Sequence, residues 1–286
     1  RIWQFGNTLL IMVNFYKDKV IIVTGASSGI GLASARNFAS MGAKLVLASR
    51  NIDKLEEIAE ELSVVSHQQS VLCVKTDVTK EEDCKNLIEQ TVKNFGKIDI
   101  LINNAGISMR AVFKDMDLKV MKSLMDTNFW GTVYCTKYAL PYLLESKGSI
   151  VGVISTAGYV GLPARTGYSA SKFAIRGFLE TLRIEHLYDD LHVMIFAPGF
   201  TSSNIRNVAL TADGSPQGET PRNEERMMSA ERVAKIMARG IHKRKTHMVL
   251  TPLGKATLFA NRRLPRVTDK MEYRMMANEP DSPLKK

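Results

Sequence analysis

The sequence has few cysteines and no long apolar run. The three cysteines are an odd number, and none belongs to a CxxC pair or a Cys/His cluster, so we expect neither a disulfide framework nor a structural zinc site or other metal centre. A reducing cytoplasm is the expected compartment. No apolar run approaches the roughly 18 residues of a spanning helix. We therefore expect a chain that is soluble or at most lies on a membrane surface.

Positive charge is concentrated near the end of the chain. The 286 residues include 39 Lys plus Arg and 29 Asp plus Glu, a formal net charge of +10. Residues 239–286 hold 12 basic and 4 acidic side chains, which leaves the remainder nearly neutral. A nucleic-acid-binding protein typically spreads basic side chains over one face and interleaves them with aromatics. This chain has no such pattern, so nucleic acid is not an expected partner.

Short β-branched runs alternate with longer stretches of helical periodicity along most of the chain. The runs show little alternation between apolar and polar residues, which is typical of strands buried on both faces of a parallel sheet. We therefore predict an α/β fold with one doubly wound domain. Strands are expected at residues 19–23, 44–48, 71–75, 98–102, 149–154 and 192–196.

The chain divides into three expected parts. Residues 1–16 precede the first strand and are interpreted as an N-terminal extension or tag remnant, with translation starting at Met12. Residues 17–251 form the main domain, including a polar insertion at 201–226 that is either a mobile lid over a site or a disordered loop. Residues 252–286 form a basic tail with helical stretches broken at Pro265.

A glycine-rich segment, TGASSGIG at residues 24–31, follows the first expected strand and opens a helix. Glycines let a backbone turn sharply and approach a pyrophosphate, and the free N–H groups of a helix N-terminus attract negative charge. The pattern is weak by itself, but the strand before it and the helix after it are the context that a dinucleotide site requires. The alternative is a plain flexible loop.

The end of the second expected strand bears on which nicotinamide cofactor fits. An acidic residue there accepts from the adenosine ribose and favours NAD, whereas small polar and basic residues accommodate the phosphate of NADP. Here the strand ends in Ser49 and Arg50, which favours NADP(H) over NAD(H). Asn51 is expected to cap the next helix, and Asp53 is interpreted as a carboxylate in the first turn of that helix.

Tyr168 and Lys172 lie four residues apart at the start of a strongly periodic helix, so their side chains share one face. A neighbouring ammonium favours a phenolate and lowers the pKa of the phenol, which suits acid–base work. Alone, the pair is more often a surface feature. Ser155 and Asn104, at the ends of two expected strands, and Asn128, inside an apolar helix, add polar groups at the sheet edge where such folds bind ligands.

Taken together these segments resemble the short-chain dehydrogenase/reductase family. The matching features are TGxxxGxG at 24–31, Asp77, NNAG at 103–106, Asn128, Ser155, YxxxK at 168–172 and Pro198-Gly199, over roughly residues 17–250. Residues 106–110 and 210–215 are similar to the branch of dehydrogenase/reductase member 7B and the hydroxysteroid dehydrogenases. The resemblance implies a single NADP-binding Rossmann domain with a seven-stranded parallel sheet, whose seventh strand lies around residues 247–251.

The resemblance also implies site residues. Tyr168 would be the acid–base group, Lys172 would hold the nicotinamide ribose and lower the Tyr168 pKa, Ser155 would hydrogen-bond the carbonyl oxygen, and Asn128 would support a water in a proton relay. In place of a threonine common in the family, the chain has Ser203. The cofactor residues implied are Gly25, Ser27, Ser28, Gly29, Ile30, Gly31, Ser49, Arg50, Asp77, Val78, Asn104, Ala105, Gly106, Tyr168, Lys172, Pro198, Gly199 and Thr201.

The expected function is NADP(H)-dependent interconversion of a ketone and a secondary alcohol on a bulky apolar substrate. The alternatives are a sensor or scaffold that binds NADP(H) without turnover, and a ketodihydrosphingosine-type lipid reductase at a membrane surface. The basic tail either roofs the substrate pocket or makes peripheral membrane contact. Arg110 and Arg165 could meet an acidic substrate group, but surface exposure is the favoured interpretation. By family analogy we expect a homodimer or homotetramer.

Overall fold

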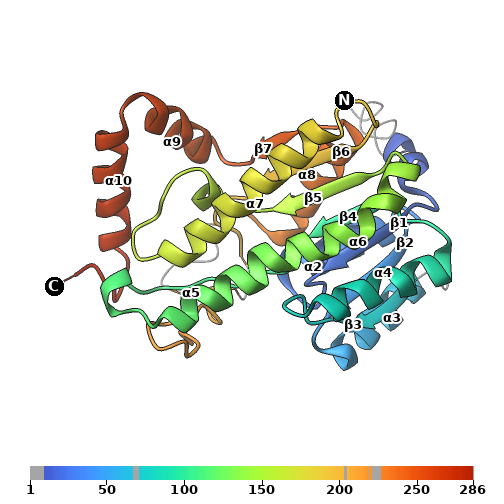
Figure 1. The fold of residues 1–286 in the computed structure, drawn as a ribbon, viewed down its shortest axis with the longest axis horizontal. Helices are drawn as coiled ribbons and strands as arrows, with labels where there is room; N and C mark the ends of the chain where they lie inside the picture. The colour runs from blue at the N-terminus through green and yellow to red at the C-terminus, as the bar shows by residue number, and fades with distance from the viewer. Residues whose placement is uncertain (1–9, 67–70, 203–204, 219, 221–226, 286) are drawn as a thin grey trace.

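A seven-stranded sheet, parallel throughout, runs through the molecule (Figure 1). The structure is a computed structural model and describes residues 10–66, 71–202, 205–218, 220 and 227–285. The strand order β3-β2-β1-β4-β5-β6-β7 confirms the predicted doubly wound α/β fold, and every expected strand forms within two residues of its predicted limits. The strands are β1 (Val20–Thr24), β2 (Lys44–Ser49), β3 (Val71–Lys75), β4 (Ile100–Asn103), β5 (Ser149–Val153), β6 (His192–Ala197) and β7 (His247–Val249).

Helices connect the strands and cover both faces of the sheet. The bounds are α2 (Gly29–Ala39), α3 (Ile52–Ser66), α4 (Glu81–Phe95), α5 (Leu118–Leu124), α6 (Gly131–Glu145), α7 (Thr166–Glu185), α8 (Ala230–His242), α9 (Pro252–Arg263) and α10 (Pro265–Ala277), with short helical turns at Phe113–Asp115, Met125–Trp130 and Thr156–Gly158.

Two apolar cores separate these helices from the sheet. Ile21 and Val23 of β1 pack into a core with α2, α3 and α8, whereas Val20 and Ile22 pack into a core with α4, α6 and α7. Alternate side chains of one strand thus enter opposite cores, and β1 is buried along its whole length. This two-sided burial explains why the strand sequences lack polar alternation.

The segment before β1 is part of the first core. Residues 10–16 are helical, Met12 and Tyr16 are buried, and the Tyr16 hydroxyl donates a hydrogen bond of 2.6 Å to the Ala238 carbonyl of α8. Burial raises the pKa of Tyr16, so its hydroxyl stays protonated. We expected the whole segment 1–16 to precede the domain, but residues 10–16 pack within it. The proposed start at Met12 stays a prediction.

The first turn of α3 is as the sequence predicts. The Asn51 side chain accepts a hydrogen bond of 3.0 Å from the backbone N–H of Lys54, which caps the helix. Asp53 lies in that first turn, where its negative charge interacts favourably with the helix dipole. The Asp53 carboxylate is therefore explained without a ligand.

The insertion and the tail lie beyond the carboxyl ends of the strands. In the insertion, Leu210 forms an isolated β-bridge with Met109. The Leu210 carbonyl accepts a hydrogen bond of 2.8 Å from the Arg110 N–H, and the Leu210 N–H donates one of 2.9 Å to the Ser108 carbonyl. Ser203 lies outside the described residues. The tail breaks at Pro265 as predicted, because Leu264 separates α9 from α10. Figure 1 shows these two helices at one end of the molecule, opposite the end with β3 and α3.

Candidate active site

The glycine segment forms a tight turn between β1 and α2. Gly25 has φ +66°, a left-handed value that suits glycine. A Cβ on Gly31 would lie 2.2 Å from the Gly25 carbonyl oxygen, so a side chain there would collide with the backbone. Within the described residues the Ser28 side chain makes no capping hydrogen bond to α2. The first N–H groups of α2 therefore have no side-chain acceptor from its cap residue, and Ser28, Gly29 and Ile30 line the crevice described below.

Thr24 and Asn104 lock this turn to the end of β4. The Asn104 amide donates to the carbonyl oxygens of Thr24 (2.9 Å) and Gly25 (3.3 Å). In return, the Thr24 hydroxyl accepts hydrogen bonds of 3.0 Å from the backbone N–H groups of Asn104 and Ala105. We expected Asn104 at this edge but assigned no role to Thr24. A threonine directly before the glycine turn was the available signal.

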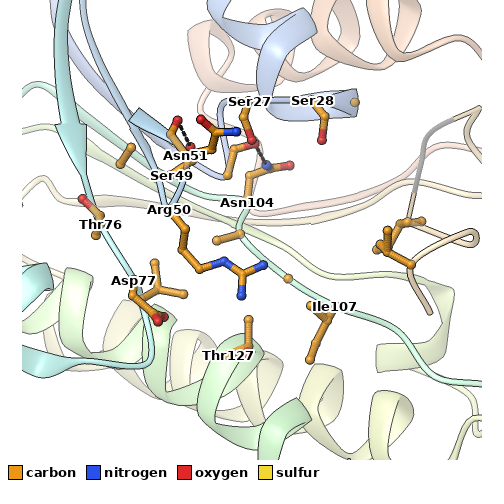
Figure 2. A pocket seen from close by; sticks show the side chains of 18 of the residues that line it. Ser27, Ser28, Ser49, Arg50, Asn51, Thr76, Asp77, Asn104, Ile107 and Thr127 are labelled. Atoms are coloured by element: carbon orange, nitrogen blue, oxygen red, sulfur yellow. Dashed lines mark hydrogen bonds between the residues drawn. The ribbon is translucent and has the colours of Figure 1, made fainter. Parts of the chain in front are cut away.

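A crevice of about 360 Å³ opens along this edge. Figure 2 shows Arg50 reaching into it, with its guanidinium pointing toward Thr127 and Ile107. Asn51, Thr76, Thr79, Ile205 and Val208 also line it, although the sequence predicted no ligand role for them. The predicted residues that line it are Gly25, Ser27, Ser28, Gly29, Ile30, Ser49, Arg50, Asp77, Val78, Asn104, Ala105 and Gly106.

Asn128 connects the NNAG segment to α7. It is fully buried in a π-helical turn over Met125–Trp130, a form that occurs frequently at functional sites. Its side-chain oxygen accepts from the Ile107 N–H (2.8 Å), and its amide donates to the Ile107 carbonyl (3.0 Å) and the Ser171 hydroxyl (2.9 Å). The buried amide is thus satisfied on both ends, as its position in an apolar helix requires.

Ser155 and Tyr168 meet at a small cavity of about 90 Å³ beyond β5. Ser155 follows that strand, and its hydroxyl accepts a hydrogen bond of 3.2 Å from the Ala157 N–H. Burial raises the pKa of Tyr168, and a hydrogen bond with Ser155 and the positive charge of Arg165 oppose that rise. The Ser155 and Tyr168 hydroxyls therefore lie within hydrogen-bonding reach of one another at the cavity, and their predicted catalytic roles stay predictions.

Lys172 is buried behind Tyr168. Its ammonium donates a hydrogen bond of 2.9 Å to the Val153 carbonyl and lies 5.7 Å from the centre of the Tyr168 ring. Burial lowers the pKa of Lys172 to about 8. A Cβ on Gly106 would lie 3.4 Å from this ammonium, so Lys172 also borders the NNAG segment. The groups that lower the Tyr168 pKa here are Ser155 and Arg165, whereas we expected Lys172 to do so.

The segment after β6 closes the far side of the small cavity. Pro198 is buried directly after that strand, Gly199 lines the cavity, and the buried Thr201 donates to the Gly199 carbonyl at 3.1 Å. A third cavity of about 440 Å³ lies between this segment and the tail helices. It shares Thr156, Leu162, Gly199 and Phe200 with the small cavity, so the two cavities adjoin one another.

Arg110 and Arg165 are not surface residues, which corrects our interpretation. Their side chains are only 8% and 13% exposed, because both pair with the Glu279 carboxylate of the C-terminal segment. Glu279 and Met276 line the small cavity with Tyr168. Nothing local in the sequence marks Glu279, since its partners lie more than 100 residues earlier in the chain. The tail thus supplies walls of both cavities.

Other site types can be examined in the described part of the chain. There, no group of three or more His, Cys, Asp or Glu side chains could hold a metal ion, and none of the helices combines the length and apolarity needed to cross a membrane. Cys73, Cys84 and Cys135 are free thiols.

Several known proteins are similar to this chain in sequence. The profile of the short chain dehydrogenase family matches residues 19–213. 11-beta-hydroxysteroid dehydrogenase 1A of Arabidopsis thaliana is 42% identical over 193 residues, 67% of this chain and 54% of that protein, so this chain spans about half of it. Dehydrogenase/reductase SDR family member 7B of Rattus norvegicus is 38% identical over 242 residues, 83% of this chain and 74% of that protein.

Two solved structures are similar in fold, each at 24% identity. An alcohol dehydrogenase from the archaeon Thermococcus sibiricus, complexed with 5-hydroxy-NADP, has a TM-score of 0.73 and covers 82% of this chain and 96% of its own. A short chain dehydrogenase/reductase from Burkholderia phymatum, in complex with NAD, has a TM-score of 0.78 and covers 88% and 95%.

The family profile covers more than half of the chain, and the rat relative confirms the match over most of its length. The resemblance seen in the sequence is therefore confirmed, including its branch. The chain belongs to the short-chain dehydrogenase/reductase family of oxidoreductases, with hydroxysteroid dehydrogenases and member 7B among its relatives.

Proposed function

We propose that this protein is an NADP(H)-dependent oxidoreductase that interconverts a ketone and a secondary alcohol on a bulky apolar substrate. The observation that carries the proposal is the meeting of the Ser155 and Tyr168 hydroxyls at a small cavity. A larger cavity adjoins it, and the glycine crevice lies at the same sheet edge. The cofactor and the substrate, between which a hydride would pass, thus each have a space to bind.

The crevice suits a dinucleotide. The turn at Gly25 and Gly31 leaves no room for side chains, so backbone N–H groups at the start of α2 can approach a pyrophosphate directly. Gly25, Ser27, Ser28, Gly29, Ile30 and Gly31 would hold that pyrophosphate, and Asp77 and Val78 the adenine. Lys172 and the Pro198–Thr201 segment would hold the nicotinamide end. When bound, the nicotinamide supplies or accepts the hydride.

Arg50 supports NADP(H) over NAD(H). Its guanidinium points into the crevice, and Ser49 and Asn51 beside it carry no negative charge (Figure 2). A guanidinium and small polar groups suit a ribose phosphate, which a carboxylate would repel. Ser49 and Arg50 are therefore the residues to which we assign the choice of cofactor.

Tyr168 would exchange a proton with the substrate oxygen while Ser155 hydrogen-bonds that oxygen. Burial favours the neutral phenol, which is the form that gives a proton in the reductive direction. Lys172, held by the Val153 carbonyl, lies behind the Tyr168 ring and would hold the nicotinamide ribose there. Asn128 fixes α7 to the NNAG segment and so positions Tyr168.

The apolar side chains that line the larger cavity support a bulky apolar substrate. Its walls include Val160, Phe200, Met228, Met271 and Met275, and methionine side chains adapt to apolar ligands of irregular shape. One relative is named a hydroxysteroid dehydrogenase and another a dehydrogenase/reductase. A hydroxysteroid is a bulky apolar ligand of this kind. The ketone would enter the small cavity and the apolar body would occupy the larger one.

Substitution of the phenol tests the proposal. Tyr168→Phe removes the acid–base hydroxyl, so we expect kcat with NADPH and a panel of apolar ketones to fall about 10³-fold, while the Kd for NADPH measured by calorimetry changes little. Tyr188→Phe is the matched control, because Tyr188 is 95% exposed, and should keep full activity. Retained turnover in Tyr168→Phe would refute the role of Tyr168.

NADPH binding without turnover of any ketone by the unmodified protein would instead favour a sensor or scaffold. The four predicted catalytic side chains are all present and buried or lining the site, which supports an enzyme. We therefore keep the sensor as the second outcome of the same experiment.

The tail also supports a peripheral membrane role compatible with catalysis. Leu253 and Phe259 on α9, Leu264 between the helices, and Val267 and Tyr273 on α10 are apolar or aromatic side chains more than half exposed, among the basic residues of the tail. Such a mixture binds anionic lipid surfaces. Flotation with phosphatidylserine vesicles should show binding that is lost when residues after Thr251 are removed, and this would favour a lipid reductase at the membrane.

A homo-oligomer is the assembly we propose. Trp130 next to α6, Phe173 and Ile184 on α7, and Leu187 just beyond α7 are all more than 40% exposed, and exposed apolar patches are typical of interaction surfaces. Light scattering should give the mass of a dimer or tetramer rather than 31.9 kDa.

A further inference from the structure

Two arginines from distant parts of the chain hold one carboxylate next to the small cavity. Nη2 of Arg110 lies 3.6 Å and Nη2 of Arg165 lies 3.4 Å from the same oxygen of Glu279. Arg110 also donates to the Pro280 carbonyl. Glu279 is 6% exposed, so this ion triad is largely shielded from water, where charges interact strongly.

The carboxylate is fixed by the chain on either side of it. The backbone N–H of Glu279 donates to the Met276 carbonyl at 3.4 Å, and the Ser282 hydroxyl donates to the same carbonyl at 2.7 Å. Met276 is itself buried at the end of α10. The turn that follows α10 therefore holds Glu279 against the arginines. The position of the Glu279 carboxylate thus depends on the backbone of this turn and not on the rotation of an exposed side chain.

Glu279 borders the space that a ketone would enter. The small cavity is lined by Ser155 and Tyr168 together with Arg165, Met276 and Glu279. The adjoining larger cavity lies between this region and α9 and α10. A substrate whose carbonyl reaches Tyr168 thus brings the groups attached to that carbonyl close to the triad.

We propose that Glu279 is a specificity-determining residue: it occupies the anion-binding position between Arg110 and Arg165, and so restricts the substrate end beside Tyr168 to uncharged groups. This inference rests on the proposed function. An incoming carboxylate must either displace Glu279, which its own chain keeps at a high effective concentration, or remain beside it and be repelled. The site thus rejects one class of ligand by repulsion while its apolar walls accept another.

Removal of the Glu279 charge should reverse this selection. With Glu279→Gln, the guanidiniums of Arg110 and Arg165 would both lose the Glu279 charge. Arg165 lines the small cavity, and Nε of Arg110 is buried with no hydrogen-bond partner among the described residues. An anionic ligand would then find a ready charge partner. Glutamine has nearly the shape of glutamate, so the packing of the turn changes little.

Binding of two matched ligands gives the test. Octanoate and octanamide differ in charge but hardly in shape, and their Kd values would be measured by calorimetry on the protein with and without saturating NADP⁺. The unmodified protein should bind octanamide at least tenfold more tightly than octanoate. Glu279→Gln should bind octanoate at least tenfold more tightly than the unmodified protein does, with octanamide affected less than threefold.

Two further variants separate charge from packing. Asp281→Asn removes an exposed carboxylate two residues away and should leave both affinities unchanged. Glu279→Asp keeps the charge on a shorter side chain and should still reject octanoate. Equal binding of octanoate by the unmodified protein and Glu279→Gln, or a parallel gain for both ligands, would overturn the inference.

The readout does not depend on turnover, so its failure can be told apart from failure of the proposed function. If Tyr168→Phe abolishes ketone reduction but the octanoate results contradict the inference, only the role of Glu279 is wrong. If no ketone is turned over but octanoate selection follows Glu279, the arginine pair is an anion position in a protein that is not this reductase.

Discussion

The cofactor crevice and the substrate end of this molecule are built in different ways. The crevice is formed by the ends of neighbouring strands and the short turns that follow them, such as residues 25–31 and 104–107. The substrate end joins residues near 110, 165, 200 and 279. Most of the crevice wall consists of such short motifs, to which Ile205 and Val208 of the insertion are added. The substrate end instead depends on contacts between residues as far apart as Arg110 and Glu279.

This difference teaches where specificity can change without loss of the fold. The crevice shares its backbone with the sheet edge, so its shape is tied to the main cores. The substrate end is lined by a tail and an insertion whose described residues belong to neither main core, and the tail is held by the ion pairs of Glu279 with Arg110 and Arg165. The first region should therefore tolerate little change, and the second should tolerate more.

The largest effect is expected in the crevice, at Gly31. In Gly31→Ala the new methyl would meet the Gly25 carbonyl oxygen at 2.2 Å and the Asn104 amide at 2.7 Å, so the turn must shift. We expect the free energy of unfolding to fall by about 3 kcal/mol and the Kd for NADPH to rise about 100-fold. Urea unfolding and calorimetry measure the two effects.

Gly177→Ala is the matched control for Gly31. A Cβ there would meet nothing within 4 Å, and alanine is favoured over glycine inside a helix by about 1 kcal/mol, so α7 should be stabilised. If Gly31→Ala binds NADPH with an unchanged Kd, the crevice accepts changes in its backbone, and the expected difference between the two regions is wrong.

A smaller effect is expected at Lys172, between the two regions. Burial lowers its pKa from 10.5 to about 8, so the unfolded chain binds more protons between these values and stability rises with pH across that window. Lys172→Met removes the buried charge. We expect it to raise the free energy of unfolding of the cofactor-free protein by about 2 kcal/mol at pH 7, and by progressively less as the pH approaches 10.5.

Urea unfolding of both proteins at pH 7, 8.5 and 10 measures this difference. Turnover should be lost in Lys172→Met at every pH, because the amine that would hold the nicotinamide ribose is gone. A stability difference that does not change with pH would mean that packing, and not the charge of Lys172, is its cause.

The smallest effect is expected at Arg50, on the exposed rim of the crevice. Arg50→Gln removes the guanidinium while leaving the strand intact, so the Kd for NADPH should rise about tenfold and the Kd for NADH should stay the same. Fluorescence titration with each cofactor measures both values. An equal loss for NADH would show that Arg50 contacts a part that both cofactors share.

The sequence predicts the fold and the crevice well because both depend on local patterns. Runs such as 71–75 and 192–196 are apolar on both faces, and the structure places them as parallel strands. The glycine turn, Asn104 and Asn128 come from short segments whose chemistry can be interpreted without a partner. Their roles in binding and catalysis stay predictions that the experiments above test.

The features that the sequence did not predict are those that depend on distant partners. Arg110 and Arg165 were expected on the surface because long basic side chains usually are, and only the fold brings Glu279 to them. The core position of Tyr16 likewise depends on a bond to Ala238. Sequence periodicity describes one element at a time, so it is silent on contacts of this range.

The two edges of the sheet limit how copies of this chain can meet. One edge strand, β7, has only three residues and leads into Pro252 at the start of α9, and the other, β3, ends in the exposed Lys75. Short and charged edges are poor templates for strand addition and for fibre growth. Copies would therefore associate through helices, and a change in the number of subunits would leave the hydrogen bonding of the sheet as it is.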